Sequence, residues 1–453
     1  MALSALLQVA EEWLPVFVLD PRLMLPGDAG GARPRFLLDC LARLGRDLEK
    51  RGVPLLVREG RPEEVLPKLL HRTGAGLLSF NEGATPFARR RDAAVAGAAE
   101  RSGVQLITRL DHVVYRSSEV RTAAGGPYAV YSPYRRSWWK RWSREPRRPV
   151  GIGRLSPPIP GFSADRIPDP REYGIEAGAC DVPTGGEDAA KRRLDRFLST
   201  AARRYAEDRD RPDRDGTSRL SPYLRFGAIS VRQCFDRAEE AAHEDPPLGA
   251  GVSKWLDELI WREFYSAILE EHPRVLRESH RREYDALVWN DDADGFRAWC
   301  DGRTGFPIVD AGMRQLRATG WMHNRVRMIV ASFLTKDLLI DWRQGERFFF
   351  EHLVDGDPAS NNGGWQWAAS TGTDAQPWFR IFNPVTQGRR WDPEGSYVRR
   401  WVPELRGVPD GSIHAPWEAA TPSDYPPPIV DHAERRELAL ERFREAREKS
   451  AKR

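Results

Sequence analysis

The spacing of apolar residues changes near residue 190, and this change limits the folds that the chain can adopt. Before it, short β-rich runs alternate with helical stretches. The β-rich runs occupy residues 14–19, 54–57, 76–80 and 104–107, and the helical stretches between them include 35–51 and 62–72. Such alternation is typical of βαβ units built around a parallel sheet. We therefore expect a Rossmann-like α/β domain over residues 1–120.

The residues after 190 follow a different spacing. Apolar residues recur at helical intervals within 252–271, 306–319 and 324–339, and strand signals almost disappear. A chain of 453 residues is also longer than one hydrophobic core usually supports. The pattern predicts a second, all-α domain over residues 191–430.

Two stretches are expected to lie outside these domains. Residues 121–190 are rich in Pro, Gly and Arg with little periodicity, which favours an interdomain connector without regular structure. Within it, YSPYRRSWWKRW (131–142) mixes basic and aromatic side chains as single-strand binders do. A solvated connector with its aromatics packed on a domain is the favoured interpretation. The charged tail, 431–453, is interpreted as an exposed helix or a frayed end.

Composition excludes several classes of protein. No run approaches the ~20 apolar residues that a membrane span needs, and no basic region precedes the short apolar start, so we expect a cytoplasmic protein. The four cysteines form no C-x-x-C pair, which argues against a disulfide framework, a zinc site or an iron–sulfur cluster. The net charge of +4 with 70 Lys and Arg allows basic patches but does not establish a nucleic-acid partner.

Two motifs could carry chemistry or could be purely structural. The segment TSRLSP (217–222) offers hydroxyls and an Arg at a helix start, which suits a phosphate, although plain helix capping is favoured on spacing alone. Helical geometry places Trp255, Glu258, Trp261 and Arg262 in one arc, so two indoles flank a carboxylate. An aromatic core stripe with a Glu258–Arg262 ion pair is the equal alternative.

Three further features are equally open. His323, at a predicted helix start, is interpreted as a structural residue more readily than as an acid or base. The segment DGDPASNNGGWQWAASTGTD (355–374) crowds carboxylates, amides and glycines beside two tryptophans, which favours a ligand site over a polar loop. Trp289, Trp342 and Trp365 could be core anchors or an electron-hopping chain; their spacing does not separate the two, and core packing is favoured at this point.

Five ordered blocks carry a resemblance to a known family. They are GTSRLSPYL (216–224), WLDELIWREFY (255–265), TGFPIVDAGMRQL (304–316), GWMHNRVRM (320–328) and DGDPASNNGGWQW (355–367). Together they resemble the photolyase/cryptochrome family, most closely the class I cyclobutane pyrimidine dimer photolyases. The resemblance is strongest from residue 204 to residue 405 and moderate over the α/β portion.

The resemblance implies that the helical domain holds FAD without a covalent bond. The implied FAD-binding residues are Tyr205, Thr217, Ser218, Arg219, Leu220, Ser221, Trp255, Arg262, Arg327, Asp355, Gly356, Asp357 and Asn361. Asn361 would lie at the reactive nitrogen of the flavin, and Arg327 would pair with Asp355 beside the ring. Trp365, Trp342 and Trp289 would form an electron-transfer triad, in that order from the flavin outward.

The resemblance also implies light-driven repair of ultraviolet-damaged DNA by a monomer. Excited reduced FAD would donate one electron to a flipped-out pyrimidine dimer, while protein groups position the dimer and stabilise its transient anion. Residues implied to face the dimer or DNA are Arg209, Glu258, Trp261, Arg262, Tyr265, Asn324, Arg325, Met328, Trp367, Thr386 and Gln387. Glu258, Asn324 and Asn361 are the implied catalytic residues.

The sequence departs from the family pattern in two places, and two alternative functions stay open. Family members begin with a strand and an Arg-rich turn that this sequence lacks, so the first, central strand of the sheet is expected to be missing. The word NEGATPF (81–87) differs from the usual one, so a second, antenna chromophore of either folate or deazaflavin type stays open. The alternative functions are a cryptochrome-like blue-light sensor and a (6-4) photolyase. Asn324 disfavours the latter, because (6-4) enzymes carry a second His there.

Overall fold

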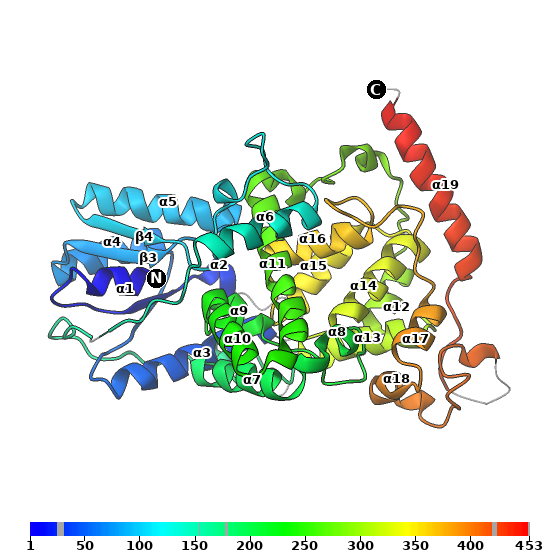
Figure 1. Ribbon diagram of the computed structural model, residues 1–453, viewed down its shortest axis with the longest axis horizontal. Coiled ribbons are helices and arrows are strands. Elements are labelled where there is room, and N and C mark those ends of the chain that lie inside the picture. The colour runs from blue at the N-terminus through cyan, green and yellow to red at the C-terminus, as the bar shows by residue number, and fades with distance from the viewer. Residues whose placement is uncertain (25–30, 154, 177–179, 419–423, 452–453) are drawn as a thin grey trace.

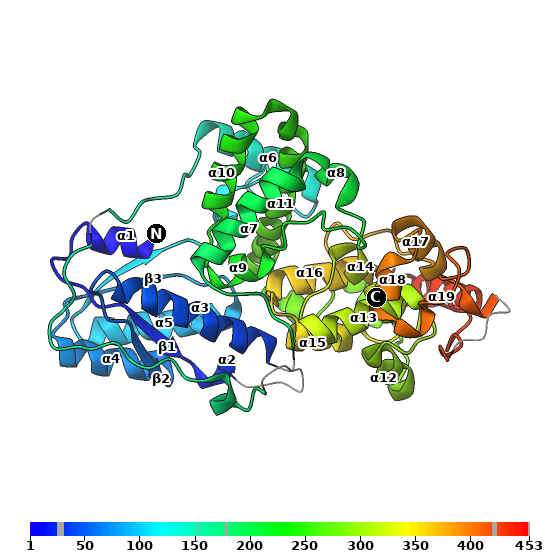
Figure 2. The ribbon, with the colours of Figure 1, turned by 90° about the horizontal axis from the view of Figure 1, so that it is seen from below.

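The structure is a computed structural model that describes residues 1–24, 31–153, 155–176, 180–418 and 424–451. An α/β part lies at one end of the long axis and a helical part fills the rest, with the N-terminus in the former and the last helix at the opposite end (Figures 1 and 2). The α/β plus all-α architecture predicted from the apolar spacing is therefore confirmed.

Four short parallel strands form the sheet portion. They are β1 (Val16–Leu19), β2 (Leu56–Glu59), β3 (Leu77–Asn81) and β4 (Gln105–Arg109). β1 pairs with β2 in the register Val16 to Leu56, and β3 pairs with β4 in the register Leu77 to Gln105. Each strand begins within two residues of its predicted start, because turn residues bound each β-rich run.

The two strand pairs do not join into one sheet among the described residues. A cavity of about 1040 Å³ separates them, lined by residues of β1 such as Phe17 and of β3 such as Leu78. In doubly wound folds the pairs on either side flank the first strand, which lies at the centre of the order. A strand at the centre of the order would lie between the two pairs, and the described residues place none there.

Helices pack around these strands. They are α1 (Ala2–Leu7), α2 (Pro21–Met24), α3 (Ala32–Glu49), α4 (Pro62–Thr73) and α5 (Pro86–Arg101). Apolar residues of α3, among them Leu38 and Leu41, share a core with Leu19 and Val57 of β1 and β2. α1 packs against β3 and β4 instead.

The helical part is built around one long apolar helix, α11 (Gly249–Glu271). The other helices of this part are α7 (Glu187–Thr200), α8 (Tyr205–Asp208), α9 (Ser221–Phe226), α10 (Val231–Glu244), α12 (Ala293–Asp301), α13 (Pro307–Thr319), α14 (Asn324–Ser332), α15 (Trp342–His352), α16 (Pro358–Ala368), α17 (Pro384–Trp391), α18 (Ser396–Trp401) and α19 (His432–Ala451). α11 contacts α8, α10 and α16. Among the described residues, no helix combines the length and apolar character that crossing a bilayer requires.

Three segments differ from the sequence-based expectation. The stretch expected to lack regular structure contains a 14-residue helix, α6 (Tyr131–Arg144), whose Tyr134, Trp138 and Trp142 are buried in the core. The aromatics are thus packed on a domain, as favoured. The helix predicted over 324–339 ends at Ser332 and is followed by one π-helical turn, Phe333–Asp337. The prediction missed this change because apolar spacing cannot distinguish an α-helix from a single π-helical turn.

The charged tail is a packed helix and not a frayed end. Phe443 of α19 is fully buried and its ring lies 5.5 Å from that of Tyr284. The ammonium of Lys336, from the π-helical turn, lies 3.4 Å from the centre of the Phe443 ring. His432 pairs with the buried Asp337 at 2.5 Å. α19 therefore closes the far end of the helical part.

Candidate functional site

Helix α11 carries an acid and an indole that are partly exposed beside a buried indole. Trp255 is buried, whereas Glu258 and Trp261 are partly exposed. Glu258 does not pair with Arg262, which was the structural alternative for this motif. It accepts a short hydrogen bond from Arg209, while Arg262 donates to the backbone carbonyl of His112. The carboxylate of Glu258 is therefore fixed by a cation 49 residues earlier in the chain.

A second ion pair extends this polar rim. Arg325 pairs with Asp210 at 2.8 Å, next to Arg209 in the sequence. The Arg325 guanidinium also lies 4.6 Å from the ring centre of Trp391. The indole N–H of Trp391 in turn donates to Gln387 at 3.0 Å. Three residues implied to contact DNA thus lie on connected segments: Arg209 directly after α8, Arg325 on α14 and Gln387 on α17.

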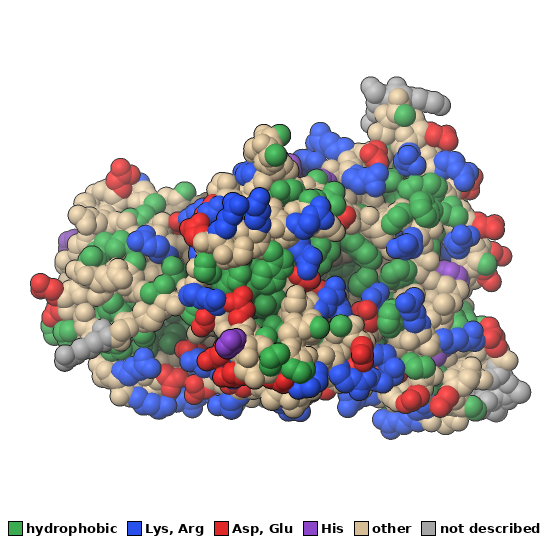
Figure 3. All heavy atoms as spheres, in the orientation of Figure 1, with side chains coloured by type: hydrophobic (Ala, Val, Ile, Leu, Met, Phe, Trp, Pro, Cys, Tyr) green, Lys and Arg blue, Asp and Glu red, His purple; other side chains and the backbone are tan. Residues whose placement is uncertain are grey.

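The remaining residues implied to face the dimer or DNA are placed around the same helices. The amide of Asn324 lies 3.9 Å from the sulfur of Met328. The ring of Trp367 meets that of Phe382 edge-on at 6.5 Å. The backbone N–H of Thr386 donates to the capping residue of α17. Figure 3 shows a hollow on this face of the helical part, with hydrophobic side chains inside it and Lys and Arg side chains near its rim.

Tyr265, on α11, packs closely against α16. A Cβ added at Gly363 would lie 2.1 Å from the Tyr265 ring, so only glycine permits this approach of the two helices. The Tyr265 ring also contacts Trp261 at 5.5 Å between centroids. Both residues on α11 are therefore positioned by tight packing.

One group of residues implied to bind FAD gathers before α9. The indole N–H of Trp255 donates to Ser218 Oγ at 3.2 Å. Trp255 also packs on Phe197, whose ring meets Tyr205 edge-on at 5.6 Å. Thr217 and Leu220 continue the same segment, and Ser221 is the first residue of α9. Trp255 and Tyr205 thus lie together with the hydroxyl-rich segment 217–221.

Arg219 in this segment has an unusual backbone. Its φ is +49°, a backbone angle that residues other than glycine rarely adopt. Such conformations cluster at ligand sites. Its guanidinium lies 4.8 Å from the ring centre of Trp321. The conformation holds the Arg219 side chain beside the block at 320–328.

A second group surrounds the loop before α16. Arg327 pairs with Asp355 at 2.9 Å, as the resemblance implied. Asp357 caps α16 by accepting a hydrogen bond of 2.9 Å from the Ser360 N–H. Burial raises the pKa of Asp357, but Arg225 and Arg262 nearby outweigh it, so the pKa lies below its ordinary value and the carboxylate is charged. A Cβ at Gly356 would lie 2.7 Å from the Arg33 guanidinium.

Two residues near this loop were missed by the sequence analysis. Glu346 of α15 accepts from the Asn361 side chain through its backbone carbonyl, at 2.9 Å, and from the Asn362 side chain through its carboxyl, at 3.0 Å. Burial raises the pKa of Glu346 to about 7. Arg33 reaches the loop from α3 and stacks over Phe350 at 4.1 Å. An acid four residues after Trp342 was the available signal for Glu346, whereas nothing local marks Arg33.

The three tryptophans of the implied triad share one hydrophobic cluster. Trp365 and Trp342 are buried, and Trp289 packs against the same cluster and is partly exposed. A Cβ at Gly345 would lie 2.1 Å from the Trp365 ring, so α15 and α16 approach closely where these indoles lie. Trp289 is thus the outermost of the three, while Trp342 and Trp365 both lie in the interior.

His323 caps helix α14. Its Nδ1 accepts a hydrogen bond of 3.2 Å from the Arg325 N–H. Burial lowers the pKa of His323 to about 3, so the imidazole is neutral at physiological pH. The structural interpretation of this residue is thus favoured over an acid–base role.

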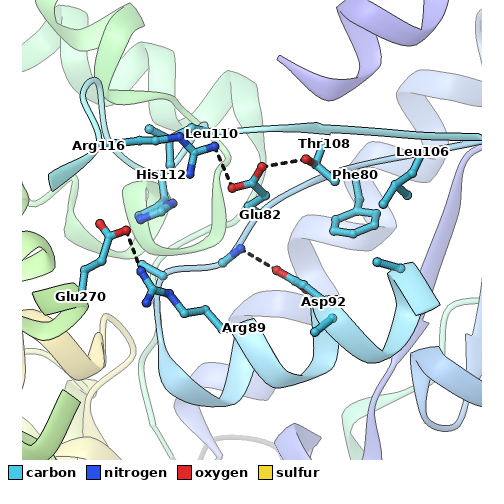
Figure 4. Close-up of a pocket in the computed structure, with 14 residues that line it drawn as sticks. Phe80, Glu82, Arg89, Asp92, Leu106, Thr108, Leu110, His112, Arg116 and Glu270 are labelled. Atoms are coloured by element: carbon cyan, nitrogen blue, oxygen red, sulfur yellow. Dashed lines mark hydrogen bonds and ion pairs between the residues drawn. The ribbon is translucent and has the colours of Figure 1, made fainter. Parts of the chain in front are cut away.

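A separate cavity of about 320 Å³ lies at the carboxyl ends of β3 and β4, where the α/β part meets α11 (Figure 4). Glu82 crosses it, accepting from Arg116 at 2.8 Å and from Thr108 at 2.7 Å. Arg89 of α5 pairs with Glu270 of α11 at 2.6 Å. Burial lowers the pKa of His112 to about 4, so that imidazole is neutral as well.

Comparison with known proteins supports the resemblance. Residues 255–445 match the family model described as the FAD binding domain of DNA photolyase, and residues 1–150 match the model described as DNA photolyase. A deoxyribodipyrimidine photo-lyase of Halobacterium salinarum is 42% identical over 442 residues, covering 95% of this chain and 91% of that protein. The helical part is thus the FAD-binding domain of a class of flavoproteins. The chain belongs to the DNA photolyase family.

Solved structures agree with this placement. A class III photolyase of Agrobacterium tumefaciens superposes with a TM-score of 0.86 at 36% identity, covering 99% of this chain and 94% of that chain. A cryptochrome of Synechocystis superposes with a TM-score of 0.86 at 28% identity, covering 95% of this chain and 93% of that chain.

The residues present fit FAD. Arg33, Arg219 and His323 each bury a side-chain nitrogen that has no hydrogen-bond partner among the described residues. Buried polar atoms are rarely left unpaired, and the phosphate, ribose and ring atoms of a dinucleotide supply partners of this kind. Arg219 belongs to the 217–221 segment and Arg33 lies beside Gly356 of the 355–357 loop, the two places where the resemblance implies FAD.

Proposed function

We propose that this protein repairs cyclobutane pyrimidine dimers in DNA with light. The observation that carries the proposal is the meeting of Glu258, Trp261 and Arg209 at the surface of α11, next to segments that fit FAD. When bound, reduced FAD supplies one electron to the dimer on excitation and takes it back after the ring opens. Everything else in the reaction falls to the side chains of the chain.

The side chains bind and orient the damaged bases. A flipped dimer leaves the duplex more readily than an intact base, so the pocket selects for damage at the extrusion step. Trp261 and Trp367 offer faces on which the two bases stack. Glu258, held by Arg209, and Asn324 offer hydrogen-bonding groups to the polar edges of the bases. The Asn324 amide N–H donates to base oxygens and thereby stabilises the negative charge that develops on the dimer, whereas the Glu258 carboxylate accepts from a base N–H.

The other residues serve the cofactor and the DNA backbone. Arg327 and Asp355 would orient the flavin ring, and Asn361 would lie near its reactive nitrogen. Trp289, Trp342 and Trp365 would carry electrons from the surface toward an oxidised flavin. Arg325, Thr386 and Gln387 contact the DNA strand, with an affinity that falls as salt rises. The protein acts as a monomer in the cytoplasm.

The alternative function is blue-light sensing, which the likeness to a cryptochrome structure raises. The two functions separate in one experiment, in which the reduced protein is illuminated with DNA that carries either a cyclobutane dimer or a (6-4) photoproduct. Repair of the cyclobutane dimer alone is the expected result. Bound flavin without repair of either lesion would support a blue-light sensor. Repair of the (6-4) product alone would support a (6-4) photolyase.

A second chromophore is proposed for the cavity at the carboxyl ends of β3 and β4. Ligands of open α/β sheets bind in this position, and the cavity lies beside the flavin-binding part. Heat release of noncovalent pigments from the purified protein, followed by chromatography, would identify a folate or a deazaflavin. Release of FAD alone would contradict an antenna in this cavity.

A further inference from the structure

Tyr131, the first residue of α6, lies flat against Trp261. The two ring centroids are 3.6 Å apart and the ring planes differ by 11°. Tyr131 is 6% exposed, whereas Trp261 is partly exposed. An indole has two faces, and Tyr131 covers one of them. A base that stacks on Trp261 must therefore use the other face.

The Tyr131 ring is fixed by contacts at several points. Its hydroxyl donates to the backbone carbonyl of Asp257 at 2.6 Å. Burial, with Asp257 and Glu258 nearby, raises the pKa of Tyr131, so the hydroxyl keeps its proton and remains a donor. Its backbone N–H donates to the carboxylate of Asp374 at 3.1 Å, and Phe264 meets the ring edge-on at 5.8 Å. The ring is therefore a rigid support.

The same helix also holds the turn of α11 that carries the site. Asp257 accepts from Arg135 at 2.5 Å and from the Trp139 indole at 3.1 Å. Asp257 directly precedes Glu258, and its side chain is almost fully buried. Residues of α6 thus fix α11 from behind, on the side opposite to the open face of Trp261.

We propose that Tyr131 is a positioning residue that sets the recognition of the damaged base. By stacking behind Trp261, it holds the indole in the one orientation in which its open face meets a flipped dimer. Preorganisation of this kind improves affinity because the side chain loses less freedom on binding. The proposal rests on the proposed function, since it takes Trp261 to be a dimer-stacking residue. It also assigns a role to the aromatic and basic segment at 131–142.

The test is the ratio of dissociation constants for intact and dimer-containing oligonucleotides, measured in the dark on flavin-loaded protein. Tyr131→Leu should lower this ratio roughly three- to tenfold, the range expected for an aromatic pair. Tyr131→Phe keeps the ring and should retain most of the ratio. Trp261→Leu should lower the ratio roughly tenfold or more. The double variant should lose no more than Trp261→Leu alone.

Tyr134→Leu is the matched control, because Tyr134 is equally buried on α6 but is not stacked on Trp261. It should lower stability while keeping the ratio. A wild-type ratio in Tyr131→Leu, with a loss in Trp261→Leu, would overturn the inference and leave the proposed function intact. An equal loss in Tyr131→Phe or Tyr134→Leu would also overturn it, since the ring stack would then not be the cause. A wild-type ratio in Trp261→Leu would overturn both the inference and the stacking role.

Discussion

The backbone carbonyl of Glu346 accepts a hydrogen bond of 2.9 Å from the side-chain amide of Asn361, so α15 fixes the residue proposed to lie at the flavin nitrogen. Burial raises the pKa of the Glu346 carboxyl to about 7. In the unfolded chain this group ionises near its ordinary value of about 4.3. The folded protein therefore binds the additional proton between these two values.

This difference predicts how stability depends on pH. As pH rises from about 5 to about 8, the contribution of Glu346 to stability should fall, because the folded state binds more protons than the unfolded state in that window. Glu346→Gln removes the titration and should be more stable than the wild type at pH 8 by roughly 1–3 kcal/mol, with little gain at pH 5. Urea unfolding at the two values measures this, with the exposed Glu441→Gln as control. An unchanged pH dependence in Glu346→Gln would contradict the assignment.

Glu258 is predicted to serve repair and not flavin binding. Glu258→Ala removes a hydrogen-bonding carboxylate worth about 1.5–3 kcal/mol, so the repair rate should fall roughly 10- to 100-fold at saturating light. The flavin content should stay at the wild-type value, because the Glu258 carboxylate is hydrogen-bonded to Arg209, which is not among the residues implied to bind FAD. Glu240→Ala, on the exposed surface of α10, is the control for a general loss of charge. Repair at the wild-type rate in Glu258→Ala would remove its role.

Trp365 is predicted to serve photoreduction and not repair. Trp365→Phe should slow the light-driven reduction of oxidised flavin at least tenfold, because phenylalanine is far harder to oxidise than tryptophan. Repair by chemically reduced protein should be spared. Absorbance during illumination with an external reductant follows the first, and dimer loss follows the second. The control is Trp142→Phe, because Trp142 is a buried tryptophan in a different hydrophobic cluster from Trp365. This variant should photoreduce normally.

The packing of α19 predicts a large loss of stability on truncation of Phe443. Phe443→Ala leaves a cavity and also exposes one side of the buried Lys336 ammonium, so unfolding should become about 3–5 kcal/mol easier. Burial holds the pKa of Lys336 well below its ordinary value, so Lys336→Met should be tolerated far better. Urea unfolding compares the two with the exposed Glu437→Ala. A cost below about 1 kcal/mol for Phe443→Ala would show that the tail contributes little.

Local patterns in the sequence were enough for most of the fold. The parallel strands at Val16 and Leu77 follow from short β-rich runs separated by helical ones, and the helical blocks carry the residues that the resemblance implies for FAD. The π-helical turn at Phe333–Asp337 could not be predicted, because its residues are buried and keep an apolar spacing that continues the helix.

Contacts between distant segments could not be predicted from local patterns. Arg209 and Glu258 are 49 residues apart, and Tyr131 and Trp261 are farther still, so no periodicity connects them. The sequence offered Arg262 as the partner of Glu258, four residues along the same helix face. Tertiary packing placed Arg209 there instead and turned Arg262 toward His112.

The most direct test of the central claim is the loss of cyclobutane dimers from irradiated DNA under blue light, with chemically reduced protein and a matched dark sample. The account predicts that dimers disappear in the light, remain in the dark, and disappear far more slowly with Glu258→Ala. Flavin-loaded protein that leaves the dimer content unchanged under light would contradict it.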